Sequence, residues 1–206
     1  LCVSFYVALG HKLFDYNVKY VDCQDRFIVY RSGRQVGKTM STAAKAVHFA
    51  FFAPLMLKTV KHECTIVIAA PTQNQATIMF DRIRSLVINN EFLKGYIVRN
   101  TQSELWLNFL DNIPLWVRFL DNNGMTKIIT RATGETGVGL RGYSPHVIIA
   151  DECSFIKTDI LRAFLPSGMA TQAKVWLTST PFSKAGYFYE ACMNSKPKNP
   201  EGMWTE

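Results

Sequence analysis

The sequence predicts an α/β fold in which a mostly parallel central sheet is flanked by helices. Three apolar runs, at residues 64–70, 147–150 and 175–177, have the composition of strands that are buried on both faces. Stretches with helical character alternate with these runs along the chain, and this alternation is typical of a parallel sheet. With 206 residues, 48% of them hydrophobic, the chain is long enough for one large domain with a sizeable core.

The composition narrows the class of protein. The 23 Lys and Arg exceed the 16 Asp and Glu, and the net charge of +7 is compatible with a polyanionic partner, although the basic residues form no dense run. The five cysteines show no Cys-x-x-Cys spacing, so we expect neither a disulfide framework nor a zinc site, and a reducing cytosol is the simplest compartment. The most apolar stretch, residues 46–57, is too short to span a bilayer. The chain begins without Met or a basic leader, so we expect a fragment and no signal peptide.

A glycine loop follows the first expected strand, residues 26–31, and precedes an alanine-rich stretch that is expected to be a helix from Lys38 to about Ala53, ahead of a proline. The order of strand, glycine loop and helix predicts a phosphate-binding loop, because its backbone N–H groups and the positive end of the helix attract phosphate oxygens. Lys38 is expected to reach the β- and γ-phosphates of ATP, and the Thr39 hydroxyl to hold Mg²⁺.

The loop departs from the usual pattern of Gly, four residues and Gly-Lys-Ser/Thr, because Ser32 stands at the first glycine position. Arg34 and Gln35 lie inside the loop, where an ordinary NTPase carries small residues. A solvated turn ahead of a helix is the alternative interpretation. The expected nucleotide-binding residues are Ser32, Gly33, Arg34, Gln35, Val36, Gly37, Lys38 and Thr39.

Two carboxylates, Asp151 and Glu152, end the apolar run at residues 147–150. Behind a Gly-Lys-Thr loop, this pair predicts the second half of an ATPase site. Asp151 would bind Mg²⁺ through water and Glu152 would polarise the attacking water, because hydrolysis at the γ-phosphate needs an oriented nucleophile and charge compensation. ATP and Mg²⁺ are therefore the expected cofactors. A helix cap is the alternative role for such a pair.

Hydroxyl residues end the next apolar run, where Ser179 and Thr180 precede a proline. Hydroxyls beside a γ-phosphate can sense its presence and transmit the change to mobile elements, so we expect these two residues to couple hydrolysis to motion. An ordinary polar strand end is the alternative.

The first 25 residues are expected to be a lead-in to the domain. Tyr16, Asn17 and Tyr20 are its candidates for contacting a base, although packing in the core is the favoured role for the aromatic side chains. Further along, Thr72 is expected to cap a helix at residues 73–88, with Gln73 and Gln75 either solvated or in contact with nucleic acid. The core-facing stripe of this helix is expected to be Ile78, Ile83, Leu86 and Val87.

Short alternating segments between residues 104 and 131 indicate antiparallel or mixed strands at the sheet edge, with Trp106 and Trp116 as packing residues. A last helix is expected at residues 185–193. Residues 195–206 are expected to be a C-terminal linker, because prolines and lysines dominate its first half.

Four motifs in order carry a family resemblance. They are Ser-x-Arg-Gln-x-Gly-Lys-Thr at 32–39, Ala-Ala-Pro-Thr-x-x-Gln-Ala at 69–76, Gly-Leu-Arg-Gly at 139–142 ahead of Asp151-Glu152, and Ser-Thr-Pro at 179–181 with the following Gly186 and Tyr-Phe-Tyr. With them the chain resembles the ATPase domain of viral terminase large subunits, the motors that package DNA into a procapsid. The resemblance implies a P-loop NTPase fold of the additional-strand, catalytic-glutamate type, over residues 1–206.

The resemblance also implies partners and a place of action. Terminases act on double-stranded DNA, assemble as a ring of subunits, and work with a portal protein and a small terminase subunit. They act in the host cytoplasm, docked transiently on the procapsid, and no membrane is involved. A nuclease domain follows the ATPase domain in this family, and we expect none in this chain, which reaches Glu206 without the metal-binding carboxylates of a nuclease.

In such a ring, an arginine from one subunit completes the site of its neighbour. Two arginines of this chain are candidates for a catalytic role. Arg34 lies inside the phosphate loop and could reach its own nucleotide, whereas Arg141 lies on a glycine-flanked loop before the Asp-Glu strand, where it is free to project outward. An exposed surface arginine or a contact with DNA phosphate is the alternative for Arg141.

Two other functions remain open at this point. A helicase-like DNA translocase also begins with a phosphate loop, an Asp-Glu strand and a Ser/Thr-rich strand, but it needs a second motor domain. A nucleotide-binding assembly switch would bind ATP without using hydrolysis, and Glu152 argues against it because binding alone needs no carboxylate that positions water.

Overall fold

The computed structural model describes residues 2–8, 10, 12–56, 63–109, 124–140, 142–196, 198–199 and 202–206. The helices are α1 (Cys2–Ala8), α2 (Asp15–Asp22), α3 (Lys38–Met56), α4 (Gln73–Ile88), α5 (Glu91–Lys94), α6 (Thr158–Phe164) and α7 (Tyr187–Met193). The strands are β1 (Phe27–Arg31), β2 (Glu63–Ala70), β3 (Ile97–Asn100), β4 (Glu104–Asn108), β5 (Met125–Ala132), β6 (Val147–Asp151), β7 (Lys174–Ser179), β8 (Ser195–Lys196) and β9 (Trp204–Thr205). Short 3-10 turns lie at Val138–Leu140 (η2), Cys153–Phe155 (η3) and Leu165–Gly168 (η4).

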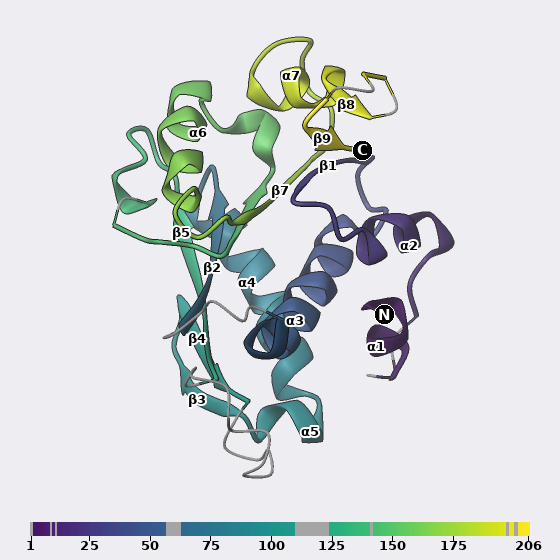
Figure 1. The fold of residues 1–206 in the computed structure, drawn as a ribbon, viewed down its shortest axis with the longest axis vertical. Coiled ribbons are helices and arrows are strands. Elements are labelled where there is room, and N and C mark those ends of the chain that lie inside the picture. The colour runs from purple at the N-terminus through teal and green to yellow at the C-terminus, as the bar shows by residue number, and fades with distance from the viewer. Residues whose placement is uncertain are drawn as a thin grey trace.

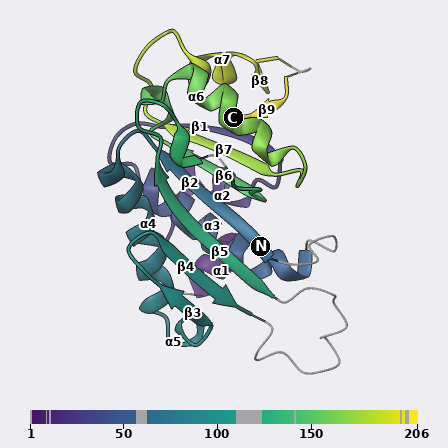
Figure 2. The same cartoon turned by 90° about the vertical axis from the view of Figure 1, so that its left-hand side faces the viewer.

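Within the described ranges, the strands form one sheet in the order β3-β4-β5-β2-β6-β7-β1-β9-β8 (Figures 1 and 2). Along this order, every neighbouring pair from β5-β2 to β9-β8 is parallel. The two pairs at the other edge, β3-β4 and β4-β5, are antiparallel. Strand β7 lies between β1, which leads into the glycine loop, and β6, which ends at Asp151. A strand inserted between these two is the additional strand of the predicted fold class, so the expected sheet with its antiparallel edge is confirmed.

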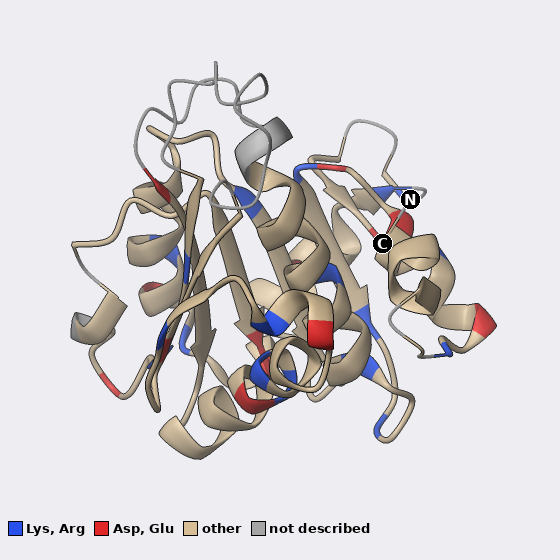
Figure 3. Ribbon diagram, turned by 90° about the horizontal axis from the view of Figure 1, so that it is seen from below, with Lys and Arg blue, Asp and Glu red and all other residues tan. Residues whose placement is uncertain are grey.

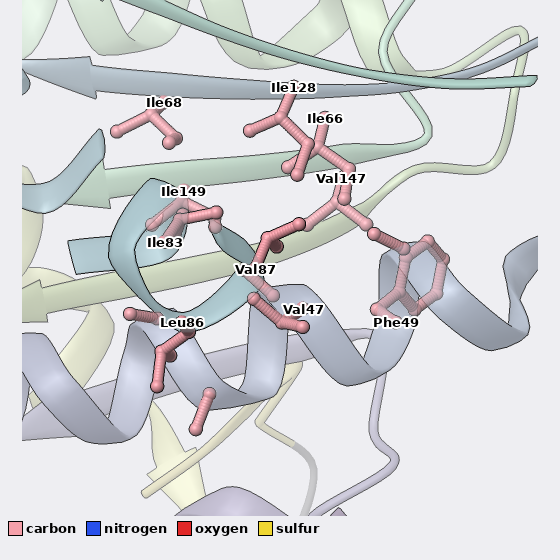
Figure 4. Close-up of a cluster of buried hydrophobic side chains, with 14 of the residues drawn as sticks. Val47, Phe49, Ile66, Ile68, Ile83, Leu86, Val87, Ile128, Val147 and Ile149 are labelled. Carbon is pink, nitrogen blue, oxygen red and sulfur yellow. The ribbon is translucent and has the colours of Figure 1, made fainter. Parts of the chain in front are cut away.

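Helices cover the sheet on both faces, and alternate residues of each central strand serve the two layers. Ile66 and Ile68 of β2 join the cluster under α3 and α4, whereas Val67 and Ala69 join the cluster that includes α6 and α7. Figure 4 shows the first cluster, where isoleucines of β2 and β6 meet Ile83 of α4. All these side chains are fully buried, as expected for a parallel sheet with helices on both faces.

Helix α3 runs three residues beyond the expected end at Ala53 and continues through Pro54 to Met56. A proline at position 54 cannot donate the helical hydrogen bond to the carbonyl of Ala50. The Thr126 hydroxyl of β5 donates to that carbonyl instead, at 3.1 Å. The sheet therefore supplies a hydrogen bond that the helix lacks, which sequence alone does not reveal.

Helix α4 has the expected bounds, and the expected cap is confirmed because the Thr72 hydroxyl accepts a hydrogen bond from the backbone N–H of Gln75 at 3.3 Å. One member of the expected stripe is wrong, since Ile78 is 57% exposed. Helix α4 turns Met79 and Phe80 toward the core instead, along with Ile83.

The antiparallel edge contains a strand that the sequence analysis did not anticipate, β3, which pairs with β4. Trp106 of β4 is a packing residue as expected, with its ring between Lys127 at 4.1 Å and Arg99 at 4.7 Å. The expected strand around residues 115–119, with Trp116, lies outside the described residues, as does Arg141.

The two ends of the chain both pack on the domain. Helix α7 starts at Tyr187, two residues later than expected, because Gly186 has a φ of 90° that no helix uses. The last residues, expected as a linker, contribute β8 and β9, and β9 pairs with β1. No helix in the described part of the chain is long and apolar enough to cross a membrane. All five cysteines are free thiols.

Candidate active site

The carboxyl ends of β1, β6 and β7 meet at one edge of the sheet, beside the amino end of α3. A cavity of about 470 Å³ opens there. Its lining residues come from the glycine loop, α3, α4 and the ends of β6 and β7: Gly33, Arg34, Gln35, Gly37, Lys38, Thr39, Met40, Arg82, Glu152 and Thr180. The topology therefore brings most of the residues predicted from the two halves of the sequence to one place.

Asn17 of α2 is hydrogen-bonded to the backbone of the glycine loop. The Asn17 amide donates to the carbonyl of Val36 at 3.1 Å, and its side-chain oxygen accepts from the Tyr30 hydroxyl. Asn17 is only 1% exposed. Gly37 has a φ of 78°, and a Cβ added there would lie 3.1 Å from the Asn17 amide nitrogen, so a glycine is required at this position.

Asn17 is thus placed to position the loop. Its burial leaves its candidate role, a contact with a base, unsupported. Tyr20 is also buried, where it stacks on Tyr30 at 4.0 Å and shares a hydrogen bond with the Thr42 hydroxyl. This confirms the favoured packing role of Tyr20. Tyr16 remains 57% exposed and stacks on Phe14.

The Lys38 ammonium lies inside the cavity and is 7% exposed. Its Nζ donates to Oε1 of Glu152 at 2.8 Å and to the Thr180 hydroxyl at 3.3 Å. One cation therefore joins the glycine loop, the end of β6 and the end of β7. An ammonium placed in this way can exchange these partners for phosphate oxygens, which also accept charge-assisted hydrogen bonds.

Glu152 occupies the left-handed region of backbone conformation, with a φ of 49°. A non-glycine residue is strained there, and such strain is common where a side chain must be aimed at a site. The next turn is fixed by Ser154, whose N–H donates to the Ser179 hydroxyl at 3.1 Å and whose hydroxyl donates to the Thr180 carbonyl at 3.0 Å.

Ser179 connects this turn to the glycine loop as well, because its carbonyl accepts from the N–H of Ser32 at 3.3 Å. Ser179 and Thr180, predicted as coupling residues, therefore lie between the loop and the segment after Glu152. This position is consistent with relaying a change from one to the other, and their role stays a prediction.

Asp151 lies behind Glu152 and is 4% exposed. Burial raises the pKa of its carboxyl group, and the hydrogen bond that the Thr178 hydroxyl donates to Oδ1 at 2.6 Å opposes this shift, together with the charge of Lys38. The neighbouring strand thus helps to keep a buried carboxylate ionised.

These residues fit a nucleotide with Mg²⁺. The glycine loop offers backbone N–H groups and a close approach at Gly37, and the cavity is large enough for phosphates. The Thr39 hydroxyl and the Asp151 carboxylate are oxygen ligands of the kind that Mg²⁺ prefers. Arg34 is exposed on the loop and lines the same cavity.

Sequence reasoning missed two residues of the site. Asn17 was considered only for a base, and its buried polar character is visible only in the fold. Arg82 of α4 lines the cavity, yet nothing in the sequence distinguishes it from the other charged residues of that helix.

The inserted strand β7, the glycine loop and the Asp-Glu pair facing it define the class of the protein, an additional-strand P-loop NTPase with a candidate catalytic glutamate. Residues 29–199 match the family described as terminase large subunit, T4likevirus-type, N-terminal. The chain belongs to this family, the N-terminal domains of the motors that package viral DNA.

Solved structures with the same fold include phage terminases. The ATPase domain of the large terminase of Thermus phage P74-26 matches with a TM-score of 0.73 and 21% identity, over 98% of this chain and 81% of that one. The large terminase of bacteriophage HK97 matches with a TM-score of 0.70 and 15% identity, over 99% of this chain and 42% of that one. The large terminase of a thermophilic bacteriophage, solved in complex with ADP, matches with a TM-score of 0.67 and 12% identity, over 94% of this chain and 44% of that one. A comparison with curated proteins gave no match.

Proposed function

We propose that this domain hydrolyses ATP in a Mg²⁺-dependent reaction and that this hydrolysis drives double-stranded DNA into a viral procapsid. The observation that carries the proposal is the contact of Lys38 with Glu152, since it brings the phosphate loop and the predicted water-positioning carboxylate to the same cavity. The solved complexes of a related fold with ADP and with ATP-γ-S support nucleotide binding at this fold.

Each residue has a distinct part in this proposal. Lys38 and the N–H groups of the loop bind the phosphates, and Glu152 accepts a proton from the attacking water. Mg²⁺, held through Thr39 and Asp151, supplies charge compensation for the phosphate oxygens. Ser179 and Thr180 report the state of the γ-phosphate to the rest of the motor.

The proposal extends to partners. The domain works as part of a homo-oligomeric ring in the host cytoplasm, with a portal protein and a small terminase subunit. Arg141 acts on the nucleotide of the neighbouring subunit, and Arg34 on its own. In the view of Figure 3, Lys and Arg positions lie among Asp and Glu positions along the ribbon.

Steady-state hydrolysis of ATP, with and without double-stranded DNA and at rising protein concentration, tests the proposal. We expect Mg²⁺-dependent turnover per subunit that rises with concentration as neighbours meet. Turnover that is already maximal at high dilution would favour a lone ATPase, and binding of ATP without turnover would favour an assembly switch.

Mixing subunits that carry different substitutions distinguishes the roles of Arg34 and Arg141. Subunits with Arg141→Ala keep Glu152, so adding subunits with Glu152→Gln should restore some activity by supplying Arg141 in trans. Arg34→Ala should show no such recovery. Absence of recovery for Arg141→Ala would place that residue outside the neighbour's site.

A further inference from the structure

Helix α4 contributes one charged residue, Arg82, to the wall of the nucleotide cavity. The glycine loop reaches the cavity from β1. Helix α4 follows β2, which pairs with β6, the strand that ends ahead of Glu152, and α4 packs against α3. The phosphate loop and Arg82 therefore belong to elements that follow different strands of the sheet.

The guanidinium of Arg82 is available for a ligand. Within the described ranges, Arg82 is exposed and its side chain makes no ion pair or hydrogen bond. The adjacent carboxylate is already engaged, because Asp81 Oδ1 lies 3.1 Å from Nη2 of Arg84. Lys38, in contrast, is paired with Glu152.

The helix holds Arg82 in a fixed position. Its sequence neighbours on α4, Met79, Phe80 and Ile83, are fully buried against the core. The backbone at position 82 is thus anchored on one side, while the side chain is left free on the other. A rigid helix with a free guanidinium needs little ordering to bind a phosphate group, whose oxygens match the two-pronged geometry of arginine.

We propose that Arg82 binds the terminal phosphate of the ATP held in the same subunit, a step that rests on the proposed ATPase function. Arg82 is then a substrate-binding residue distinct from the loop arginine and from Arg141. Arg82 lines the same cavity as Lys38 and Glu152, and in this assignment it contacts the phosphate that ADP lacks, so ATP and ADP differ in whether the contact exists.

The affinities of ATP-γ-S and ADP for the whole chain in the presence of Mg²⁺, measured by isothermal titration calorimetry, test this assignment. Arg82→Ala should weaken ATP-γ-S binding roughly tenfold or more, as expected for a lost charge-assisted pair, and change ADP binding by less than about twofold. Arg82→Lys should recover part of the loss, because lysine restores the positive charge but not the two-pronged hydrogen-bonding geometry of the guanidinium.

The matched control is Arg84→Ala, which removes an arginine two residues further along the same helix, outside the cavity. It should leave both nucleotide affinities unchanged, and thermal melting of all three variants checks that the fold is retained. Equal losses for ATP-γ-S and ADP, or none, would overturn the assignment. A loss of DNA binding by Arg82→Ala with unchanged ATP-γ-S affinity would overturn it as well and make Arg82 a contact to DNA.

Nucleotide binding by wild type and by Lys38→Ala distinguishes failure of this inference from failure of the proposed function. If wild type binds ATP-γ-S, Lys38→Ala does not, and Arg82→Ala binds like wild type, the role of Arg82 alone is rejected. If wild type binds neither nucleotide, both proposals fall.

Discussion

Nζ of Lys38 and Oε1 of Glu152 are 2.8 Å apart, so the lysine expected to bind phosphate and the carboxylate expected to activate water neutralise each other. The side chain of Glu152 is 26% exposed at the cavity, whereas Lys38 is buried. Bringing phosphates to Lys38 weakens its hold on the carboxylate. In the proposed function, Glu152 is then free to act on water only when a nucleotide is present, which would link catalysis to occupancy of the site.

Substitutions of the two residues of this ion pair should have different effects on ATP affinity and on turnover. Glu152→Gln removes the competitor of the phosphates, so we expect ATP affinity equal to or above that of wild type, with turnover reduced roughly a hundredfold or more. Lys38→Ala leaves the carboxylate without its partner cation, so both affinity and turnover should fall. Titration with ATP-γ-S and single-turnover hydrolysis measure the two quantities. Near-normal turnover by Glu152→Gln would remove this residue from the catalytic role.

The support of the glycine loop by Asn17 can be tested in the same way. Asn17→Ala removes the donor to the Val36 carbonyl and the acceptor for Tyr30, so the loop loses its anchor. We expect roughly tenfold weaker binding of ATP and of ADP alike, because the loop contacts phosphates that both share. Tyr30→Phe removes only the second hydrogen bond and should cost less. A normal affinity for Asn17→Ala would show that the loop keeps its shape without this side chain.

The central part of the fold was predictable from sequence because its strands are apolar on both faces. The run at residues 64–70 and the helix at 73–88 coincide closely with β2 and α4, where burial and capping both act locally. The edges were not predictable on the same grounds. Strand β3 has only four residues, with Val98 55% exposed, and β9 owes its place to pairing with β1.

In the site as well, some residues were predictable from local sequence and others were not. Lys38, Thr39 and Glu152 belong to motifs in which residue type and spacing reflect the chemistry. Asn17 and Arg82 take their positions from tertiary packing, and neither belongs to a pattern that one sequence can show. Ile78 illustrates the reverse error, because an apolar residue on a helix predicts burial only when the helix turns that face to the core.

The buried His48 of α3 should make the protein less stable in acid. Burial, with a further contribution from the charge of Lys45, lowers the pKa of His48 to about 4. The unfolded chain has a histidine pKa near the ordinary value of about 6.5, so between these values it binds more protons than the folded protein. The free energy of unfolding is therefore unaffected by His48 above about pH 6.5 and falls as the pH drops toward 4, by at most about 3 kcal/mol.

Chemical denaturation at a series of pH values measures this effect. His48→Phe keeps a ring against Phe5 and Phe52 but takes up no proton, so its stability should decline less steeply over the same interval. Parallel declines for wild type and variant would mean that carboxylates alone account for the acid sensitivity.

The hydrogen bond from Thr178 to Asp151 should set the pH range over which the site hydrolyses ATP. Thr178→Val keeps the shape of a buried side chain and removes the hydroxyl that donates to Oδ1. Without this donor, burial raises the pKa of Asp151 further, so the carboxylate protonates at higher pH as the solution is acidified. We expect the acid limb of the rate profile to move to higher pH, and the Mg²⁺ concentration for half-maximal turnover at neutral pH to rise roughly tenfold.

Thr178→Ser retains a hydroxyl and should restore both properties, whereas the affinity for ADP without Mg²⁺ should remain similar in all three proteins. The folded state should also lose stability in Thr178→Val at neutral pH, because a carboxylate whose folded pKa lies further above its unfolded value costs more once it is ionised. This cost vanishes below the unfolded pKa, so the melting temperatures of wild type and valine variant should converge in acid. A rate profile and a Mg²⁺ dependence that match wild type would show that Asp151 is held ionised by Lys38 without help from β7.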